Sequence, residues 1–127
     1  MNKMIWAGRI LSALSILFLL FDAAGHLIVP AQVVEAFNRL AFPLGLSPVL
    51  GIIQLICVVL YAIPRTSILG AILLTAYLGG AVATNLRVRD PLFETLFPVI
   101  IGVLVWAGLF LRDARLRALI PLTEPNI

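Results

Sequence analysis

The feature that most constrains this chain is an apolar stretch over residues 70–91, GAILLTAYLGGAVATNLRVRDP, which ends in two arginines and an aspartate. Residues 66–86 carry no charge, and a helix of that length, at about 1.5 Å per residue, crosses a hydrocarbon core of about 30 Å. Two adjacent glycines, Gly79 and Gly80, would each cost about 1 kcal/mol against alanine in a soluble helix, whereas in a membrane they let a neighbouring backbone approach. The stretch therefore predicts a transmembrane helix that packs through its small residues, Ala76, Gly79, Gly80 and Thr84.

Composition extends this conclusion to all 127 residues, of which 62% are hydrophobic and 12% charged. Such a chain is too apolar for a soluble domain, and its length suits one compact bundle, so we expect a single transmembrane domain over 1–127. Its lysines and arginines lie mostly at the ends of apolar runs, as membrane topology requires, and form no patch for nucleic acid. The lone Cys57 excludes an internal disulfide, and one cysteine with one histidine excludes zinc-finger spacing and c-type haem attachment.

Four apolar runs predict an all-α, polytopic membrane protein with an up-down-up-down four-helix bundle. Ser47-Pro48 is a helix cap followed by proline at the first helical position, and so is Asp90-Pro91. After the first run, AQVVEAFNRLAF has apolar residues at helical spacing, which predicts an amphipathic interfacial helix; a charged loop is the alternative. We expect Tyr61 to be an interfacial aromatic. The predicted ranges are 5–29, 46–63, 66–86 and 92–111 for the spans, 31–42 for the interfacial helix and 112–127 for a basic cytoplasmic tail.

The N-terminal run has two features of a signal peptide, because Lys3 and Arg9 precede it and AAG at 23–25 resembles a cleavage site. The run continues to residue 29, however, and Asp22 would be unusual immediately before cleavage. We therefore expect a retained first helix.

Orientation is predicted from the basic residues near the ends of the spans. More of them lie on the side of the termini than on the opposite side, which favours both termini in the cytoplasm. The first group is Lys3, Arg9, Arg65, Arg112, Arg115 and Arg117, and the second is Arg39, Arg87 and Arg89.

With that topology, polar side chains gather at the end of the bundle away from the termini. Asp22 and His26 are four residues apart on one helix face, and an aspartate inside a transmembrane run costs a few kcal/mol unless it has a partner. One interpretation is a proton-coupled or ligand-binding pocket, in which Asp22 orients His26 to donate to a quinone-type carbonyl or relay a proton. The alternative is a structural pair, within the helix or between Asp22 and an arginine of the third span. The candidate pocket residues are Asp22, His26, Asn85, Arg87 and Glu94, with Glu35, Gln54, Arg89 and Asp90 as secondary contacts.

Several of these residues also have simple structural explanations. Glu94 sits in the first turn of a predicted helix, where a carboxylate meets the positive end of the helix dipole. Gln54 is expected to make an interhelical hydrogen bond. A metal held by Asp22, His26 and Glu94 matches no recognised spacing, so we expect no metal site.

Four segments of the sequence carry a family resemblance. They are LFLLFDAAGHL, VVEAFNRLAFP, YAIPRTSILGAILLTAYLGGAVATNLRVRDPLF and LFPVIIGVLVWAGLFLRDARLRALIPL, of which the third is the specific one. With them the chain resembles the DoxX-like family of small four-helix bacterial membrane proteins over nearly its whole length. The resemblance implies a multi-pass protein of the bacterial plasma membrane, in a group similar to a subunit of thiosulfate:quinone oxidoreductases, with some relatives in redox-defence complexes. Such members often carry lysine at position 26 and histidine at position 85; this chain departs from that pattern at both, while Asp22, Arg87 and Asp90 keep to it.

These observations leave three functions open. The first is a quinone- or lipophile-binding redox accessory subunit with a membrane redox partner protein, and the second is a non-catalytic membrane scaffold or assembly partner. The third, transport of a small solute by an oligomer, is less favoured because four short helices form a narrow bundle without a broken-helix repeat. An independent enzyme is not expected, since a shared fold does not confer an activity. The expected partners are the lipid bilayer, the redox partner protein and a second copy of the chain packed through Gly79-Gly80 or residues 102–108.

Overall fold

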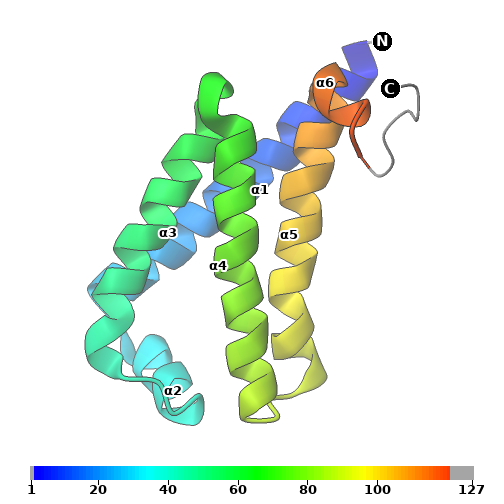
Figure 1. Ribbon diagram of the computed structural model, residues 1–127. Helices are drawn as coiled ribbons and strands as arrows, with labels where there is room; N and C mark the ends of the chain where they lie inside the picture. Colours follow the sequence, from blue (N-terminus) through cyan, green and yellow to red (C-terminus); the bar gives the residue numbers. More distant parts are fainter. Residues whose placement is uncertain (1, 121–127) are drawn as a thin grey trace.

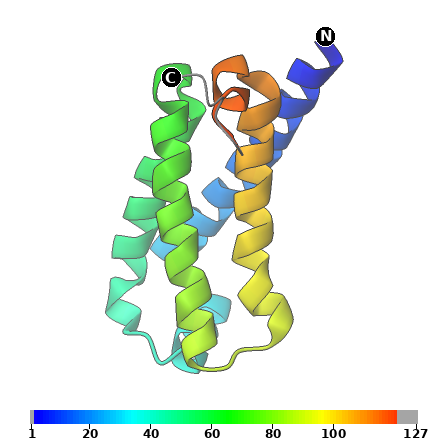
Figure 2. The same ribbon diagram turned by 45° about the vertical axis from the view of Figure 1, so that its right-hand side comes forward.

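The computed structural model describes residues 2–120, and in that range all regular structure is helical. Four long helices run along the molecule, and two short ones lie at its opposite ends (Figure 1). The long helices are α1 (Asn2–Ile28), α3 (Ser47–Ala62), α4 (Ser67–Arg87) and α5 (Leu92–Arg112), and the short ones are α2 (Ala31–Arg39) and α6 (Ala114–Arg117). Single 3-10 turns, η1 (Leu44–Leu46) and η2 (Pro64–Thr66), precede α3 and α4. The N-terminus of α1 and helix α6 lie at one end, called here the terminal end, and the other end is called the α2 end (Figures 1 and 2).

Each long helix is long and apolar enough to cross a membrane, over Lys3–Ile28, Leu44–Ala62, Pro64–Arg87 and Leu92–Arg112. Their outward surfaces carry large exposed apolar side chains, among them Phe21, Ile56, Ile72 and Val103. A protein in water rarely exposes so continuous an apolar surface, whereas lipid tails solvate it. The predicted all-α transmembrane bundle is confirmed, and the chain is a multi-pass membrane protein.

The four spans form a ring in which α1 lies diagonally opposite α4, and α3 lies diagonally opposite α5. Helix α1 packs against α3 and α5, and α4 packs against the same two helices from the other side. Helix α1 crosses the bundle obliquely behind α4 (Figures 1 and 2). The core between the helices is closed by fully buried side chains, the largest being Tyr61, Leu19, Leu74 and Leu109. The prediction that Tyr61 lies at the membrane interface is therefore wrong, because its side chain is 0% exposed.

Close helix contact occurs at glycines other than the pair that the sequence singled out. A Cβ on Gly8 of α1 would lie 2.7 Å from the carbonyl oxygen of Gly108 on α5, and a Cβ on Gly51 of α3 would lie 3.0 Å from the carbonyl oxygen of Ala23 on α1. Around Gly79 and Gly80, by contrast, nothing lies within 4 Å of an added Cβ. The prediction that Gly79 and Gly80 admit a neighbouring backbone is thus wrong within the chain, because no atom of another helix comes within 4 Å of an added Cβ at either position.

Helix α2 lies between two sharp reversals of the chain. Val29 has φ 58° and Ala41 has φ 53°, so each residue adopts the left-handed region that side chains with a Cβ rarely occupy. Helix α2 ends at Arg39, three residues earlier than predicted. Of the predicted basic tail, α6 packs Leu116 into the core, and residues 121–127 lie outside the described range.

Candidate functional site

The α2 end of the bundle contains a cavity of about 460 Å³ between α1, α3, α4 and α5, closed on one side by the α2 region. That volume lies within the range of ligand sites for small organic molecules. Its wall is mainly apolar and aromatic, with Phe18 and Phe97 in edge-to-face contact at a centroid distance of 5.2 Å. Phe37 of α2 also lines the cavity, and its ring centroid lies 5.9 Å from that of the His26 imidazole.

The polar side of the cavity comes from α1 and α4. Asp22 and His26 line it from α1, and Thr84 and Asn85 line it from α4. His26 Nδ1 bonds the backbone oxygen of Asp22 at 2.9 Å and lies 3.6 Å from the Asp22 carboxylate. A carbonyl oxygen only accepts, so Nδ1 carries the proton, and the backbone of Asp22 orients the ring more closely than its carboxylate does.

Small residues of α4 make the space for this cavity. Ala76, Gly80 and Thr84 recur every four residues, all three line the cavity, and no helix backbone fills the volume in front of them. The small-residue stripe predicted from the sequence therefore exists, but Ala76, Gly80 and Thr84 border a vacant volume instead of a neighbouring helix.

The other predicted pocket residues lie elsewhere at the α2 end. The Arg87 guanidinium donates to the carbonyl oxygen of Leu40 at 2.6 Å, and Asp90 accepts two hydrogen bonds from Arg39, at 2.9 and 3.3 Å. Together these contacts tie the end of α2 to the α4–α5 connection. The Asp90 carboxylate, whose side chain is 2% exposed, raises the pKa of Arg39 through its hydrogen bond. Arg39, Arg87 and Asp90 do not line the cavity, although Leu40 does.

Four further predicted residues also fall outside the cavity lining. Gln54 donates from Nε2 to the carbonyl oxygen of Leu19 at 2.9 Å and so joins α3 to α1. Glu94 lies in the first turn of α5, with Oε2 buried and without a hydrogen-bond partner among the described residues. Glu35 and Arg89 are exposed, on α2 and after α4.

Sequence reasoning missed Tyr77, which lines the cavity from α4 and makes no side-chain hydrogen bond to any described residue. A helical pattern could have found it, because Tyr77, Ala81, Thr84 and Asn85 lie at steps of four, three and one on one face of α4. The aromatic contributions of α2 could not be found this way, because they depend on where α2 folds back.

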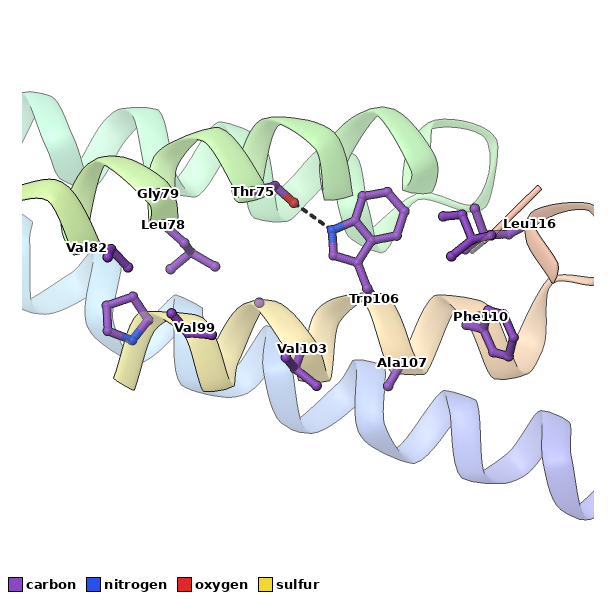
Figure 3. A pocket seen from close by; sticks show the side chains of 13 residues that line it. Thr75, Leu78, Gly79, Val82, Val99, Val103, Trp106, Ala107, Phe110 and Leu116 are labelled. Atoms are coloured by element: carbon purple, nitrogen blue, oxygen red, sulfur yellow. Dashed lines mark hydrogen bonds between the residues drawn. The ribbon is translucent and has the colours of Figure 1, made fainter. Parts of the chain in front are cut away.

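A second cavity, of about 530 Å³, lies on the outer side of α4 and α5 and is almost entirely apolar (Figure 3). Its two hydrogen-bonding side chains bind each other, since Trp106 Nε1 donates to Thr75 Oγ1 at 2.6 Å. Gly79 and Gly102 line it, so the volume in front of Gly79 belongs to this groove. The groove offers apolar contact but no free polar group, and the cavity with Asp22 and His26 is the candidate functional site.

The described residues hold no group of three or more His, Cys, Asp or Glu side chains placed to bind a metal ion. Four apolar spans around one cavity with a polar side define a small polytopic membrane protein with a candidate site for an amphipathic molecule. The sequence profile of the DoxX-like family matches residues 10–108, and the chain belongs to this family. No curated protein sequence and no solved structure matches it.

Proposed function

We propose that this protein binds a quinone-type lipophile in the α2-end cavity and acts as an accessory subunit beside a membrane redox partner. The observation that carries the proposal is the cavity itself, which combines an apolar, aromatic wall with polar groups on one side. A lipophile with a ring-shaped polar head has the matching distribution, because aromatic side chains hold the ring, and Asp22, His26 and Asn85 lie together on the polar side, where the head would sit. The residues present thus fit a quinone, which would supply electron-carrying chemistry when bound.

The chain's own residues suit binding and proton exchange at this site. Because Nδ1 of His26 donates to the Asp22 carbonyl oxygen, Nε2 is the nitrogen free to exchange a proton with a ligand oxygen. Phe37 packs beside the imidazole and shields it from water on the α2 side. These residues hold and orient a head group, and electron transfer falls to the partner protein.

The proposal is tested by mass spectrometry of molecules that co-purify with the protein in mild detergent. We expect a stoichiometric quinone-type lipophile, oxidised or reduced, with the wild type, and less of it with Asp22→Asn and His26→Ala while helical content persists. Glu35→Gln is the matched control, because Glu35 is exposed on α2 and does not line the cavity. Absence of any bound lipophile from the wild type, with both variants less thermostable, would overturn the proposal in favour of a scaffold.

A scaffold or assembly role is the second candidate, and a separate observation favours it. Arg39 and Arg87 both act structurally, since they fasten α2 to the α4–α5 connection. An α2 held in this way presents a defined surface at the membrane boundary to a partner protein. Capture of the same membrane protein by wild type and by Asp22→Asn, and its loss on Arg39→Gln, would support this role.

We further propose that the protein lies in the bacterial plasma membrane with both termini in the cytoplasm. The excess of basic residues on the terminal side supports this orientation. The test uses the buried Cys57 as a silent background and adds a single cysteine, Asn38→Cys, on exposed α2. A membrane-impermeant maleimide added to intact cells, with the outer membrane permeabilised, should label this variant; labelling only after lysis would reverse the orientation.

A further inference from the structure

The α2-end cavity has a consistent hydrogen-bonding character, which is set by how its side chains bond their own helices. Three of them donate to the carbonyl oxygen four residues earlier: His26 to Asp22 at 2.9 Å, Thr84 to Gly80 at 2.8 Å, and Asn85 to Ala81 at 2.9 Å. Each of these bonds consumes a donor and leaves an acceptor. The atoms left without a partner among the described residues are His26 Nε2 and Asn85 Oδ1, and Thr84 Oγ1 keeps its lone pairs.

The charges in the cavity wall also favour hydrogen-bond acceptors over donors. The Asp22 carboxylate accepts hydrogen bonds and donates none, and no lysine or arginine belongs to the cavity lining found among the described residues. Two arginines at the same end of the bundle bond other groups, Arg39 the carboxylate of Asp90 and Arg87 the carbonyl oxygen of Leu40. Within residues 2–120, the basic group that pairs with this carboxylate is His26, whose Nδ1 already donates to a backbone oxygen. Acceptors in an apolar cavity bind a donor strongly, because little water competes for them.

Two donors remain in the cavity wall, the hydroxyl of Tyr77 and the second amide hydrogen of Asn85. They can serve a ligand that accepts as well as donates. A hydroxyl group does both, since its hydrogen goes to Asp22 or His26 while its oxygen accepts from Tyr77. A carbonyl oxygen uses only the donors and leaves the acceptors of Asp22 and His26 unsatisfied.

We propose that the α2-end cavity selects amphiphiles whose polar end donates hydrogen bonds, so that a hydroquinone binds more tightly than the quinone of the same ring and tail. The inference rests on the proposed function, in that the cavity must bind a lipophile, and it adds which chemical form is preferred. The same chemistry extends to a protonated alkylamine, whose N–H groups meet the same acceptors. His26 is a specificity-determining residue here because its ring presents Nε2 as an acceptor.

The test compares two ligands that differ by two hydrogen atoms, decylhydroquinone and decylbenzoquinone. Their dissociation constants are measured without oxygen against the wild-type protein in lipid nanodiscs. One hydrogen bond to a charged acceptor is worth a factor of about ten or more in affinity, so we expect the hydroquinone to bind at least about tenfold more tightly. Decylamine is the third probe, and its binding above the hydroquinone would identify a cationic ligand as the source of the same donor chemistry.

Two variants separate recognition from partition into the lipid. In Asp22→Asn the carboxylate becomes an amide that also donates, so the preference for hydroquinone should fall to about threefold or less while quinone affinity stays within about threefold. Glu35→Gln should leave both affinities and their ratio unchanged. Equal binding of the two forms by the wild type, or tighter quinone binding, would overturn the preference and leave the lipophile site standing. Binding of none of the three probes would overturn both.

Discussion

The two ends of the bundle use the same kinds of residue for opposite purposes. At the terminal end, small residues bring helices into contact: Gly8 of α1 and Gly108 of α5 lie so close that a Cβ on either would meet the other helix's backbone. At the α2 end, Gly51 of α3 meets α1 in the same way, but Ala76, Gly80 and Thr84 of α4 face a cavity. A small side chain thus permits close approach only where the helix axes converge, and elsewhere it leaves volume for a ligand or for lipid.

The polar groups of the two ends differ in the same way. At the terminal end, Arg112 Nε donates to Ser12 Oγ at 3.0 Å, Ser12 lies 2.9 Å from the Tyr61 hydroxyl, and Tyr61 donates to the carbonyl oxygen of Val105 at 2.6 Å. Because Tyr61 gives its hydrogen to Val105, Ser12 must donate to Tyr61. The hydrogen bonds thus run from Arg112 of α5 through Ser12 of α1 and Tyr61 of α3 back to α5. A chain of donors that all have acceptors stabilises packing, whereas the α2 end keeps free acceptors that a ligand can use.

The largest effect that would break this comparison is expected from Gly108→Ala. The new Cβ would lie 2.8 Å from the backbone nitrogen of Ser12 and 3.1 Å from the carbonyl oxygen of Gly8, and backbone atoms cannot move aside without separating the helices. We expect a loss of about 3 kcal/mol in the free energy of unfolding, measured by thermal or denaturant unfolding in detergent.

Gly79→Ala is the matched control for that substitution, because nothing lies within 4 Å of its added Cβ. It should leave stability unchanged or raise it by up to about 1 kcal/mol, through better helix propensity. A stable Gly108→Ala protein would refute the close approach of α1 and α5. Dissociation of an oligomer by Gly79→Ala, with the protomer still folded, would instead assign Gly79 to a contact between two copies.

The two tyrosines provide a second and smaller test. Tyr61→Phe removes the central hydroxyl of the terminal-end chain. The Ser12 hydroxyl loses its acceptor and the Val105 carbonyl oxygen loses the Tyr61 donor, so we expect a loss of about 2 kcal/mol in the free energy of unfolding. Tyr77→Phe removes a hydroxyl without a hydrogen bond to any described residue and should change stability by less than about 0.5 kcal/mol. Equal losses, in denaturation curves recorded side by side, would show that the two ends do not differ as described.

The smallest effect is expected at the connection between α2 and the rest of the bundle. Arg39→Gln leaves the buried carboxylate of Asp90 without its cation, but the Arg39 side chain is 44% exposed, so water screens the pair and the loss should be about 1 kcal/mol or less. Amide hydrogen exchange should rise in α2 and stay unchanged in α4 and α5. Arg89→Gln, at an exposed position of the same connection, is the control; a matching rise there would mean that charge in general, and not the pair with Asp90, holds α2.

Much of the candidate site could be predicted from the sequence, because the polar residues of a membrane span are few. Asp22 and His26 share a helix face by spacing alone, and Asn85 follows from the end of the third span; all three line the cavity. The sequence predicts Arg87 and Glu94 for the same pocket, and Asp90 as a secondary contact, because all three lie at the same depth. Depth does not give the direction in which a side chain points, and the structure turns these residues toward α2 or into the first turn of α5.

The sequence by itself determined that this protein is a bundle of four membrane-spanning helices, since hydropathy adds up over local windows and requires no knowledge of neighbours. Only the tertiary structure decided which small residues touch another helix and that Tyr61 is buried. Those outcomes depend on how each helix is tilted and rotated, and the oblique course of α1 across α4 sets both. Where α1 converges on α5, Gly8 and Gly108 close the bundle, and at the α2 end the four spans leave a cavity beside Asp22.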